Sequence, residues 1–163
     1  MELYHGSTQK IEQPVILEQQ RLLDFGKGFY VTSSKEQAER WASIKKKRES
    51  GKPKAFVNVY RVADNLITDT SLKTKVFNDA SEEWLDFILL NRNNDLNHGY
   101  DIVFGPVAND TLYQTLTLFE SGILTKPETI SRLKVHRLFD QFSFHTPEAL
   151  TCLNFVEAYQ VSQ

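Results

Sequence analysis

Alternation of apolar and polar residues along the chain predicts short β-strands. The clearest stretch is residues 55–62, AFVNVYRV, in which every second side chain faces the same side. Residues 100–108, YDIVFGPVA, form an apolar run that Gly105-Pro106 interrupts, which predicts a strand with a bend or bulge. Three shorter strands complete the prediction: Glu2–Tyr4 ending at His5-Gly6, Phe29–Thr32, and the segment DQFSFHT that begins at Asp140.

Helical spacing of apolar residues and the presence of capping residues predict five helices. Ser34 and Gln37 form a capping box for a helix through about Ile44. Ser81 caps EEWLDFILLNR, a packing helix whose shared face is made by Trp84, Phe87, Ile88 and Asn91. The other three helices are predicted at 110–121 with Gly122 as the stop, at about Glu128–Leu138, and from Thr146-Pro147-Glu148 onward. Segregated helices and short, dispersed strands predict an α+β fold with two small, mostly antiparallel β-sheets flanked by helices.

Composition narrows the class of protein. The 163 residues, with 40% apolar and 25% charged residues, favour a single globular domain over residues 1–163. The net charge of −2 provides no global attraction to nucleic acid or to an anionic membrane. The single cysteine, Cys152, excludes an intrachain disulfide and a cysteine zinc cage. With no basic and apolar leader and no long apolar segment, we expect a soluble, cytoplasmic protein.

Basic residues concentrate in one segment, Lys45–Lys54, with the sequence KKKRESGKPK. Such a run usually ends a helix at its negative end and continues as a solvated loop. Binding of a phosphate-rich partner is the less favoured interpretation.

The stretch DFGKGFYVTSSKEQAERW, residues 24–41, is the strongest candidate for a ligand site. Gly26 and Gly28 flank Lys27, so the backbone can approach a ligand closely and the lysine can meet a phosphate. The spacing G-x-G-x-x-G is absent and a strand follows the second glycine, which excludes a dinucleotide fingerprint of the wound-sheet type. The P-loop motif is absent too. A different kind of nucleotide site is indicated.

Two motifs resemble those of the ADP-ribosyltransferases of the diphtheria-toxin and poly(ADP-ribose) polymerase type. LYHGS at 3–7 resembles their first-strand His-Gly-Ser/Thr, and FGKGFYVT at 25–32 resembles their second-strand Phe-Gly-Lys-Gly-Ile-Tyr-Phe. In that family a second aromatic residue follows the tyrosine by eleven positions, which is Trp41 here. The family's catalytic glutamate begins a late strand, and Gln141 occupies that position. The layout also resembles an uncharacterised bacterial family of ADP-ribosyltransferase-like proteins, some encoded beside small partner genes.

The resemblance implies a fold, a co-substrate and a set of site residues. It implies one ADP-ribosyltransferase-like domain that uses NAD as co-substrate and transfers single ADP-ribose units to a protein or nucleic acid, as a bacterial toxin or effector does. A small inhibitory partner protein is also implied. The implied catalytic residues are His5, Tyr30 and Gln141, and the implied NAD-binding residues are His5, Gly6, Ser7, Lys27, Gly28, Tyr30 and Trp41. In these roles Gly6 binds the carboxamide, Tyr30 and Trp41 stack on nicotinamide, and His5 and Ser7 hold ribose hydroxyls; Lys27 meets the pyrophosphate.

Glutamine in place of glutamate changes the expected chemistry. Cleavage of the nicotinamide bond passes through a cationic ribose, which a glutamate opposes with a full charge and a glutamine with only a dipole. We therefore expect slow or substrate-assisted transfer. Four other acids could supply a substitute charge, Asp101, Asp110, Asp140 and Glu148, and Asp140 could reach the site only if the strand begins one residue before Gln141. His136 and His145 are possible general bases, and the four histidines show no metal-ligand spacing, so no metal is expected.

Alternatives from other classes remain open. Each candidate residue has a plainer interpretation when taken alone: His5 as a histidine bonded to backbone, Tyr30 and Trp41 as core and rim aromatics, and the two glycines as a turn. A non-catalytic NAD or ADP-ribose sensor would keep these residues and lack the acid. An interaction module would require the apolar face of residues 82–91 to be exposed.

Overall fold

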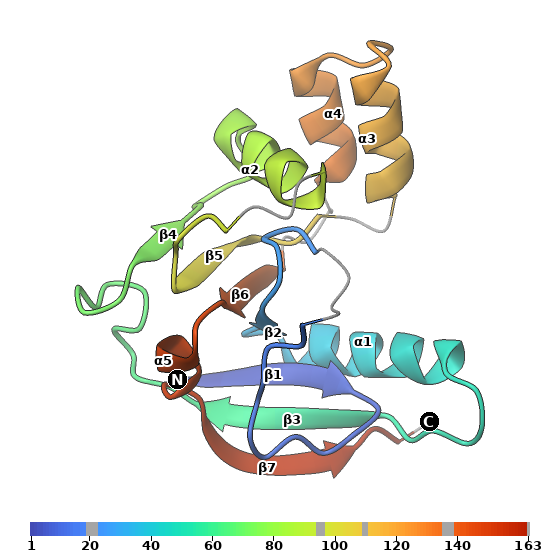
Figure 1. Cartoon of the computed structure of the whole chain (residues 1–163). Coiled ribbons are helices and arrows are strands. Elements are labelled where there is room, and N and C mark those ends of the chain that lie inside the picture. The colour runs from blue at the N-terminus through green and yellow to red at the C-terminus, as the bar shows by residue number, and fades with distance from the viewer. Residues whose placement is uncertain (19–22, 94–96, 109–110, 135–138, 163) are drawn as a thin grey trace.

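Two β-sheets organise the chain in a computed structural model that describes residues 1–18, 23–93, 97–108, 111–134 and 139–162. A three-stranded sheet has the order β1-β3-β7, and a four-stranded sheet has the order β2-β6-β5-β4 (Figure 1). All neighbouring strands are antiparallel except β4 and β5. The strands are β1 (Glu2–Ser7), β2 (Phe29–Val31), β3 (Phe56–Arg61), β4 (Thr74–Val76), β5 (Ile102–Pro106), β6 (Asp140–Phe144) and β7 (Asn154–Gln160). The predicted α+β class with two mostly antiparallel sheets is confirmed.

The helices divide between the two sheets. They are α1 (Lys35–Arg48), α2 (Glu82–Asn93), α3 (Leu112–Glu120), α4 (Lys126–Leu133) and α5 (Pro147–Leu150). The first helix packs against β1 and β3, whereas α2, α3 and α4 gather beside the four-stranded sheet, away from α1 (Figure 1). Among these described helices, none combines the length and the apolar character needed to cross a bilayer.

The two sheets meet through one backbone bridge and a shared apolar core. Tyr4 and Thr32 exchange both backbone hydrogen bonds, at 2.8 and 3.0 Å, and this isolated bridge joins β1 to β2. Buried side chains from both sheets fill the space between them, namely Leu3, Phe29, Val31, Tyr60, Ile102, Phe142, Phe144 and Leu153. Beyond the bridge, the described strands β1 and β2 form no ladder, so a backbone edge of β1 is open there.

A second core lies under α2. Trp84, Leu85 and Ile88 are fully buried, and the Trp84 indole nitrogen donates a 3.1 Å hydrogen bond to the Pro106 carbonyl. The predicted packing helix is therefore confirmed. The apolar face that an interaction module would need to expose is inside the protein.

Two element boundaries differ from the prediction around the candidate site. The first strand continues to Ser7, so His5 and Gly6 lie within β1, because residues 2–7 all pair with β3. The first helix continues to Arg48, since its last turn carries four basic residues that favour the negative end of a helix. Only half of the predicted capping box forms: Ser34 Oγ accepts from Gln37 N, while the buried Gln37 Oε1 has no hydrogen-bond partner.

Other differences concern the four-stranded sheet and the ends of the chain. The prediction of a bulge at Gly105-Pro106 is wrong: both residues pair in regular register with β6. Proline is tolerated there because β4 pairs only with Ile102–Phe104, which leaves that side of Pro106 without a partner strand. The fourth helix begins earlier, at Lys126, and ends at Leu133; the end of the predicted segment lies outside the described residues. The strands β4 and β7 were not predicted.

Candidate functional site

His5 is held in a fixed, neutral state inside β1. Its ring stacks on Phe29 with ring centroids 4.4 Å apart, and its Nδ1 lies 2.6 Å from the Tyr30 carbonyl oxygen. A carbonyl only accepts, so Nδ1 carries the proton and Nε2 remains an acceptor. Burial, with the nearby charge of Lys45, lowers the pKa of His5 to about 3. His5 is therefore positioned by backbone and can accept a hydrogen bond from a ligand hydroxyl.

Gly6 forms the open backbone edge of β1. The N–H and C=O of Tyr4 point toward Thr32, and alternation along the strand points those of Gly6 to the same side, away from β3. A Cβ at Gly6 would lie 2.1 Å from the Ala38 carbonyl oxygen, so α1 packs directly on this glycine. The resulting arrangement is a backbone donor and acceptor at the point where the two sheets part.

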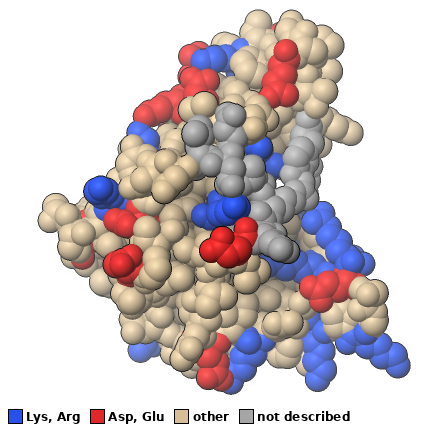
Figure 2. Space-filling model, in the orientation of Figure 1, with Lys and Arg blue, Asp and Glu red and all other residues tan. Residues whose placement is uncertain are grey.

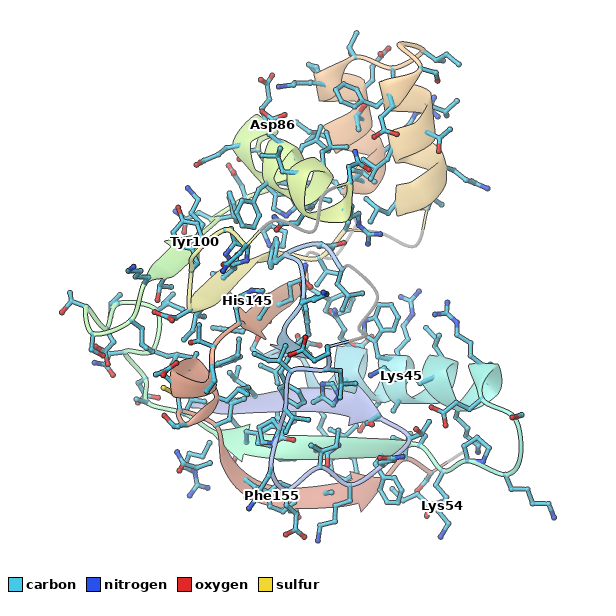
Figure 3. The ribbon with its side chains drawn as sticks, viewed as in Figure 1. Lys45, Lys54, Asp86, Tyr100, His145 and Phe155 are labelled. Carbon is cyan, nitrogen blue, oxygen red and sulfur yellow. The ribbon has the colours of Figure 1, made fainter. Side chains whose placement is uncertain are left out.

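The first helix brings Lys45 to this edge and carries Trp41 one turn before it. Trp41 is 36% exposed, and Lys45 follows it by four residues on the same side of α1. The Lys45 ammonium donates a 2.8 Å hydrogen bond to the Gly6 carbonyl, and Figure 3 shows Lys45 on α1 beside β1. Burial lowers the pKa of Lys45. The sequence alone predicted that Lys45 belongs to a solvated basic run. Its spacing of four residues from Trp41, which places both on one side of the helix, was the signal that it could belong to the candidate site.

Tyr30 has its ring on the other side of β2 from His5. Its hydroxyl donates to the Gly26 carbonyl at 2.6 Å and accepts from the Phe25 amide at 3.0 Å. Burial raises the pKa of Tyr30, with the Asp24 charge adding to the effect. The side chain of Tyr30 thus shapes the glycine-lysine-glycine turn, while its carbonyl holds His5.

Two histidines from other segments donate hydrogen bonds to the backbone of the glycine-lysine-glycine turn. His145 Nδ1 donates to the Lys27 carbonyl at 2.6 Å, and His98 Nε2 donates to the Phe25 carbonyl at 3.0 Å. Their rings are 4.4 Å apart and nearly perpendicular. Gly28 permits this contact, because a Cβ there would lie 2.9 Å from His145 Nδ1. The two glycines of the motif therefore serve a tightly packed turn, and Gly26 has a φ of +87° that favours glycine.

Both of these histidines are neutral. Ser143 donates to His145 Nε2 at 2.8 Å, and the Tyr100 amide donates to His98 Nδ1 at 3.1 Å, so each ring donates through one nitrogen and accepts through the other. Burial lowers the pKa of His145 to about 4, with the His98 charge adding to the effect, and burial lowers the pKa of His98. Figure 3 shows His145 where β6 leads into α5. These roles account for His145 without a general-base function.

Gln141 belongs to a buried polar cluster rather than to the Gly6 edge. Its Nε2 donates to Asp24 Oδ2 at 3.1 Å and to the Pro106 carbonyl at 3.3 Å. Arg92 donates to Asp24 Oδ1 at 2.6 and 3.2 Å, and the Ala108 amide lies 3.4 Å from Oδ2. Sequence reasoning missed Asp24 as an acid beside Gln141, although it begins the motif stretch. A carboxylate therefore lies next to the expected catalytic position, paired with an arginine.

Two of the other acids expected as a substitute charge, Asp140 and Asp101, are bonded to structural partners. The sixth strand does begin at Asp140, and its carboxylate accepts from Thr32 Oγ1 at 3.1 Å, from the Ser33 amide at 2.8 Å and from the Ser33 hydroxyl. Asp101 accepts from the Lys73 amide and from Thr146 Oγ1, both at 2.8 Å. Glu148 lies in the first turn of α5. Asp110 and His136 lie outside the described residues.

The structure thus brings some of the predicted catalytic and NAD-binding residues together and separates others. His5, Gly6 and Ser7 lie at the end of β1, the Tyr30 carbonyl is bonded to His5, and Trp41 lies on α1, the helix that packs on Gly6. Ser7 is buried, and its hydroxyl oxygen accepts from the Gln9 amide at 3.2 Å. Lys27 and Gly28 lie at the histidine-held turn, and Gln141 lies in the Asp24 cluster.

A separate open cleft has a volume of about 710 Å³. It lies between residues 12–18 and α5, and none of the predicted catalytic or NAD-binding residues lines it. Its lining includes His145. No group of three potential metal ligands occurs in the described parts of the chain.

Comparison with known proteins identifies the family. The chain belongs to a family of proteins of unknown function, DUF3990, whose family model matches residues 1–155. No curated protein and no solved structure matches the chain. The family match spans β1 through the start of β7, so every residue of the candidate site lies within it.

Proposed function

We propose that this chain is an NAD-dependent mono-ADP-ribosyltransferase with an ADP-ribosyltransferase-like fold. The observation that carries the proposal is the open edge of β1, where Gly6 presents a backbone donor and acceptor next to the neutral His5 and against α1, the helix that carries the exposed Trp41. The Gly6 edge is the place where the nicotinamide carboxamide would bind.

Carboxamide chemistry fits this edge. A carboxamide offers N–H donors and a carbonyl acceptor, which complement the Gly6 C=O and N–H respectively. The half-exposed ring of Trp41 offers a stacking surface for the nicotinamide ring. His5 Nε2 supplies an acceptor for a ribose hydroxyl, since Nδ1 is committed to the Tyr30 carbonyl. These contacts use the first motif, LYHGS, together with Trp41 and the backbone of Tyr30.

The proposed site offers little to stabilise the positive charge that develops on the ribose. A cationic ribose requires a nearby negative charge, and Gln141 supplies only an amide whose nitrogen is engaged by Asp24. The Asp24 carboxylate is close but is compensated by Arg92. Slow transfer of single ADP-ribose units follows from this arrangement. The acceptor is a protein or a nucleic acid, the protein acts as a bacterial toxin or effector, and a small partner protein inhibits it.

One observation favours a second candidate, a non-catalytic NAD or ADP-ribose sensor. The Gln141 amide nitrogen is bonded to Asp24 and to the Pro106 carbonyl within the buried cluster, so it has no donor left for a ribose hydroxyl. A sensor would bind NAD through the Gly6 edge without releasing nicotinamide.

Incubation of the purified protein with NAD labelled in its adenylate, in a bacterial lysate, separates the candidates. Label on protein or nucleic acid together with free nicotinamide is expected for the transferase. Trp41→Ala should weaken NAD binding by about 1 kcal/mol, since ring stacking contributes about that much beyond burial. Its melting temperature should stay unchanged because the side chain is half-exposed.

The outcomes divide clearly. Binding of NAD without label transfer or nicotinamide release would favour the sensor over the transferase. Equal NAD affinity in the wild type and Trp41→Ala would remove Trp41 from the site. No binding of NAD at all would contradict both candidates.

A further inference from the structure

We propose that Lys45 is an anion-binding residue of the Gly6 edge and that it binds a phosphate group of the nucleotide. This inference rests on the proposed function for the identity of the nucleotide. The anion-binding property itself can be tested without it.

The geometry of Lys45 sets it apart from the rest of the basic segment. Its ammonium reaches inward to the Gly6 carbonyl at 2.8 Å and lies close enough to His5 for its charge to lower the pKa of that histidine. Lys46 is partly buried like Lys45, and the remaining basic residues of the segment are exposed: Lys47, Arg48, Lys52 and Lys54. Figure 3 shows Lys54 at the far, lower edge of the three-stranded sheet. A single lysine of the run therefore contributes to the candidate site.

In the described part of the chain Lys45 forms no ion pair, although the Glu49 charge one turn along α1 partly offsets the effect of burial on its pKa. An ammonium has three donors, and the Gly6 carbonyl is a neutral acceptor for one of them. Glu49, four residues along α1, accepts a 2.9 Å hydrogen bond from Thr8 and forms no ion pair with Lys45. Partial burial lowers the pKa of Lys45, which is the signature of a poorly hydrated cation. A phosphate bound here would supply the missing negative charge.

The order of groups along α1 matches a nicotinamide nucleotide. Trp41 precedes Lys45 by four residues, or about 6 Å along the helix axis. In the nucleotide, one ribose separates the nicotinamide ring from the first phosphate. A ring on Trp41 therefore directs that phosphate toward the end of the helix on which Lys45 lies.

Binding at Gly6 and release of Lys45 are coupled. The carboxamide N–H that pairs with the Gly6 carbonyl takes the acceptor that Lys45 uses in the ligand-free chain. The displaced ammonium then has all three donors available for phosphate oxygens. The Lys45 bond to the Gly6 carbonyl carries a charge on the donor only, whereas a bond to phosphate joins two opposite charges, so the exchange is favourable.

Calorimetric titration of the wild type, Lys45→Gln and Lys47→Gln tests the inference. The ligands are nicotinamide riboside, which lacks phosphate, nicotinamide mononucleotide, and inorganic pyrophosphate. Lys47 is an exposed lysine of the same helix, so its variant loses the same charge outside the site. Lys45→Gln should lose about tenfold or more in affinity for the mononucleotide and pyrophosphate, and keep its affinity for the riboside. Lys47→Gln should match the wild type, and equal melting temperatures would establish that all three fold.

Each contrary result has a definite meaning. Equal phosphate-ligand affinity in the wild type and Lys45→Gln would overturn the inference and leave the proposed function standing if the riboside binds. Equal losses in Lys47→Gln would indicate diffuse attraction by the basic segment and would also overturn it. Lys45-dependent binding of pyrophosphate, without binding of either nicotinamide ligand, would support the anion site and contradict the proposed function.

Discussion

At the scale of single residues, the site depends on which groups donate and which accept. Gln141 lies between two acceptors, Asp24 Oδ2 and the Pro106 carbonyl, and its amide nitrogen is the donor that both require. Glutamate has a similar shape but, when ionised, only accepts. Replacing glutamine by glutamate at this position is therefore expected to change the stability of the fold before it changes any chemistry at the site.

Gln141→Glu should destabilise the fold by about 2 kcal/mol or more, because two carboxylates would face each other at the distance of the present 3.1 Å hydrogen bond. Urea unfolding at pH 7 measures the change. Combining it with Asp24→Asn restores an amide–carboxylate pair and should recover part of the loss. A single variant as stable as the wild type would contradict the observed hydrogen bonding of Gln141.

At the scale of elements, glycine and histidine determine how close the segments approach. Gly6 lets α1 lie directly on β1, and Gly28 lets β2 begin against His145. His98 and His145 connect the turn at 24–28 to the ends of β5 and β6. The turn is therefore a rigid support behind β2, and the Gly6 edge is the more open side.

Gly6→Ala should cost about 3 kcal/mol, because the new methyl group would lie 2.1 Å from a helix carbonyl and would force α1 away from β1. Gly51→Ala is the matched control: nothing lies within 4 Å, and its φ of +95° should cost about 1 to 2 kcal/mol. Chemical denaturation measures both. A smaller loss for Gly6 than for Gly51 would contradict the close packing.

Lowering the pH should reduce the free energy of unfolding, because His145, which bonds the turn at Lys27, is neutral in the fold. The pKa of His145 is lowered to about 4 in the fold, below its ordinary value of about 6.5, so the unfolded chain binds protons more readily. This contribution to stability is complete above pH 6.5 and decreases as the pH falls toward 4. Unfolding free energies measured between pH 7 and 4.5 should decline, and less steeply in His145→Gln. Parallel curves for the two proteins would show that another group is responsible.

At the scale of the whole molecule, the candidate site lies where the two sheets part. The Tyr4–Thr32 bridge brings the first strands of the two sheets together, and the shared core fixes their relative position. Charge is unevenly distributed despite the net value of −2, since Lys and Arg side chains gather around α1 and the loop that follows it (Figure 2). A phosphate-bearing ligand that enters at the end of α1 would meet this positive region first.

Local features of the chain were sufficient to predict most elements. The caps at Ser34 and Thr146 and the stop at Gly122 are used in the structure, and 55–62 forms a strand by alternation. Each of these signals involves only a few neighbouring residues, so it can be recognised in the sequence without knowledge of the tertiary structure. The weakly patterned strands β4 and β7 were missed because they are short or largely exposed.

The sequence by itself determined which chemistry-bearing residues follow one another on β1, β2 and α1. Only the tertiary structure decided that Lys45 turns inward to Gly6, 39 residues away, and that Gln141 meets Asp24 across 117 residues. The physical reason is that a side chain's partner depends on which strand faces lie together, and pairing between distant segments leaves no periodic signal in either one. Local order is encoded in neighbours along the chain, whereas the charges and hydrogen bonds of this site arise from neighbours in space.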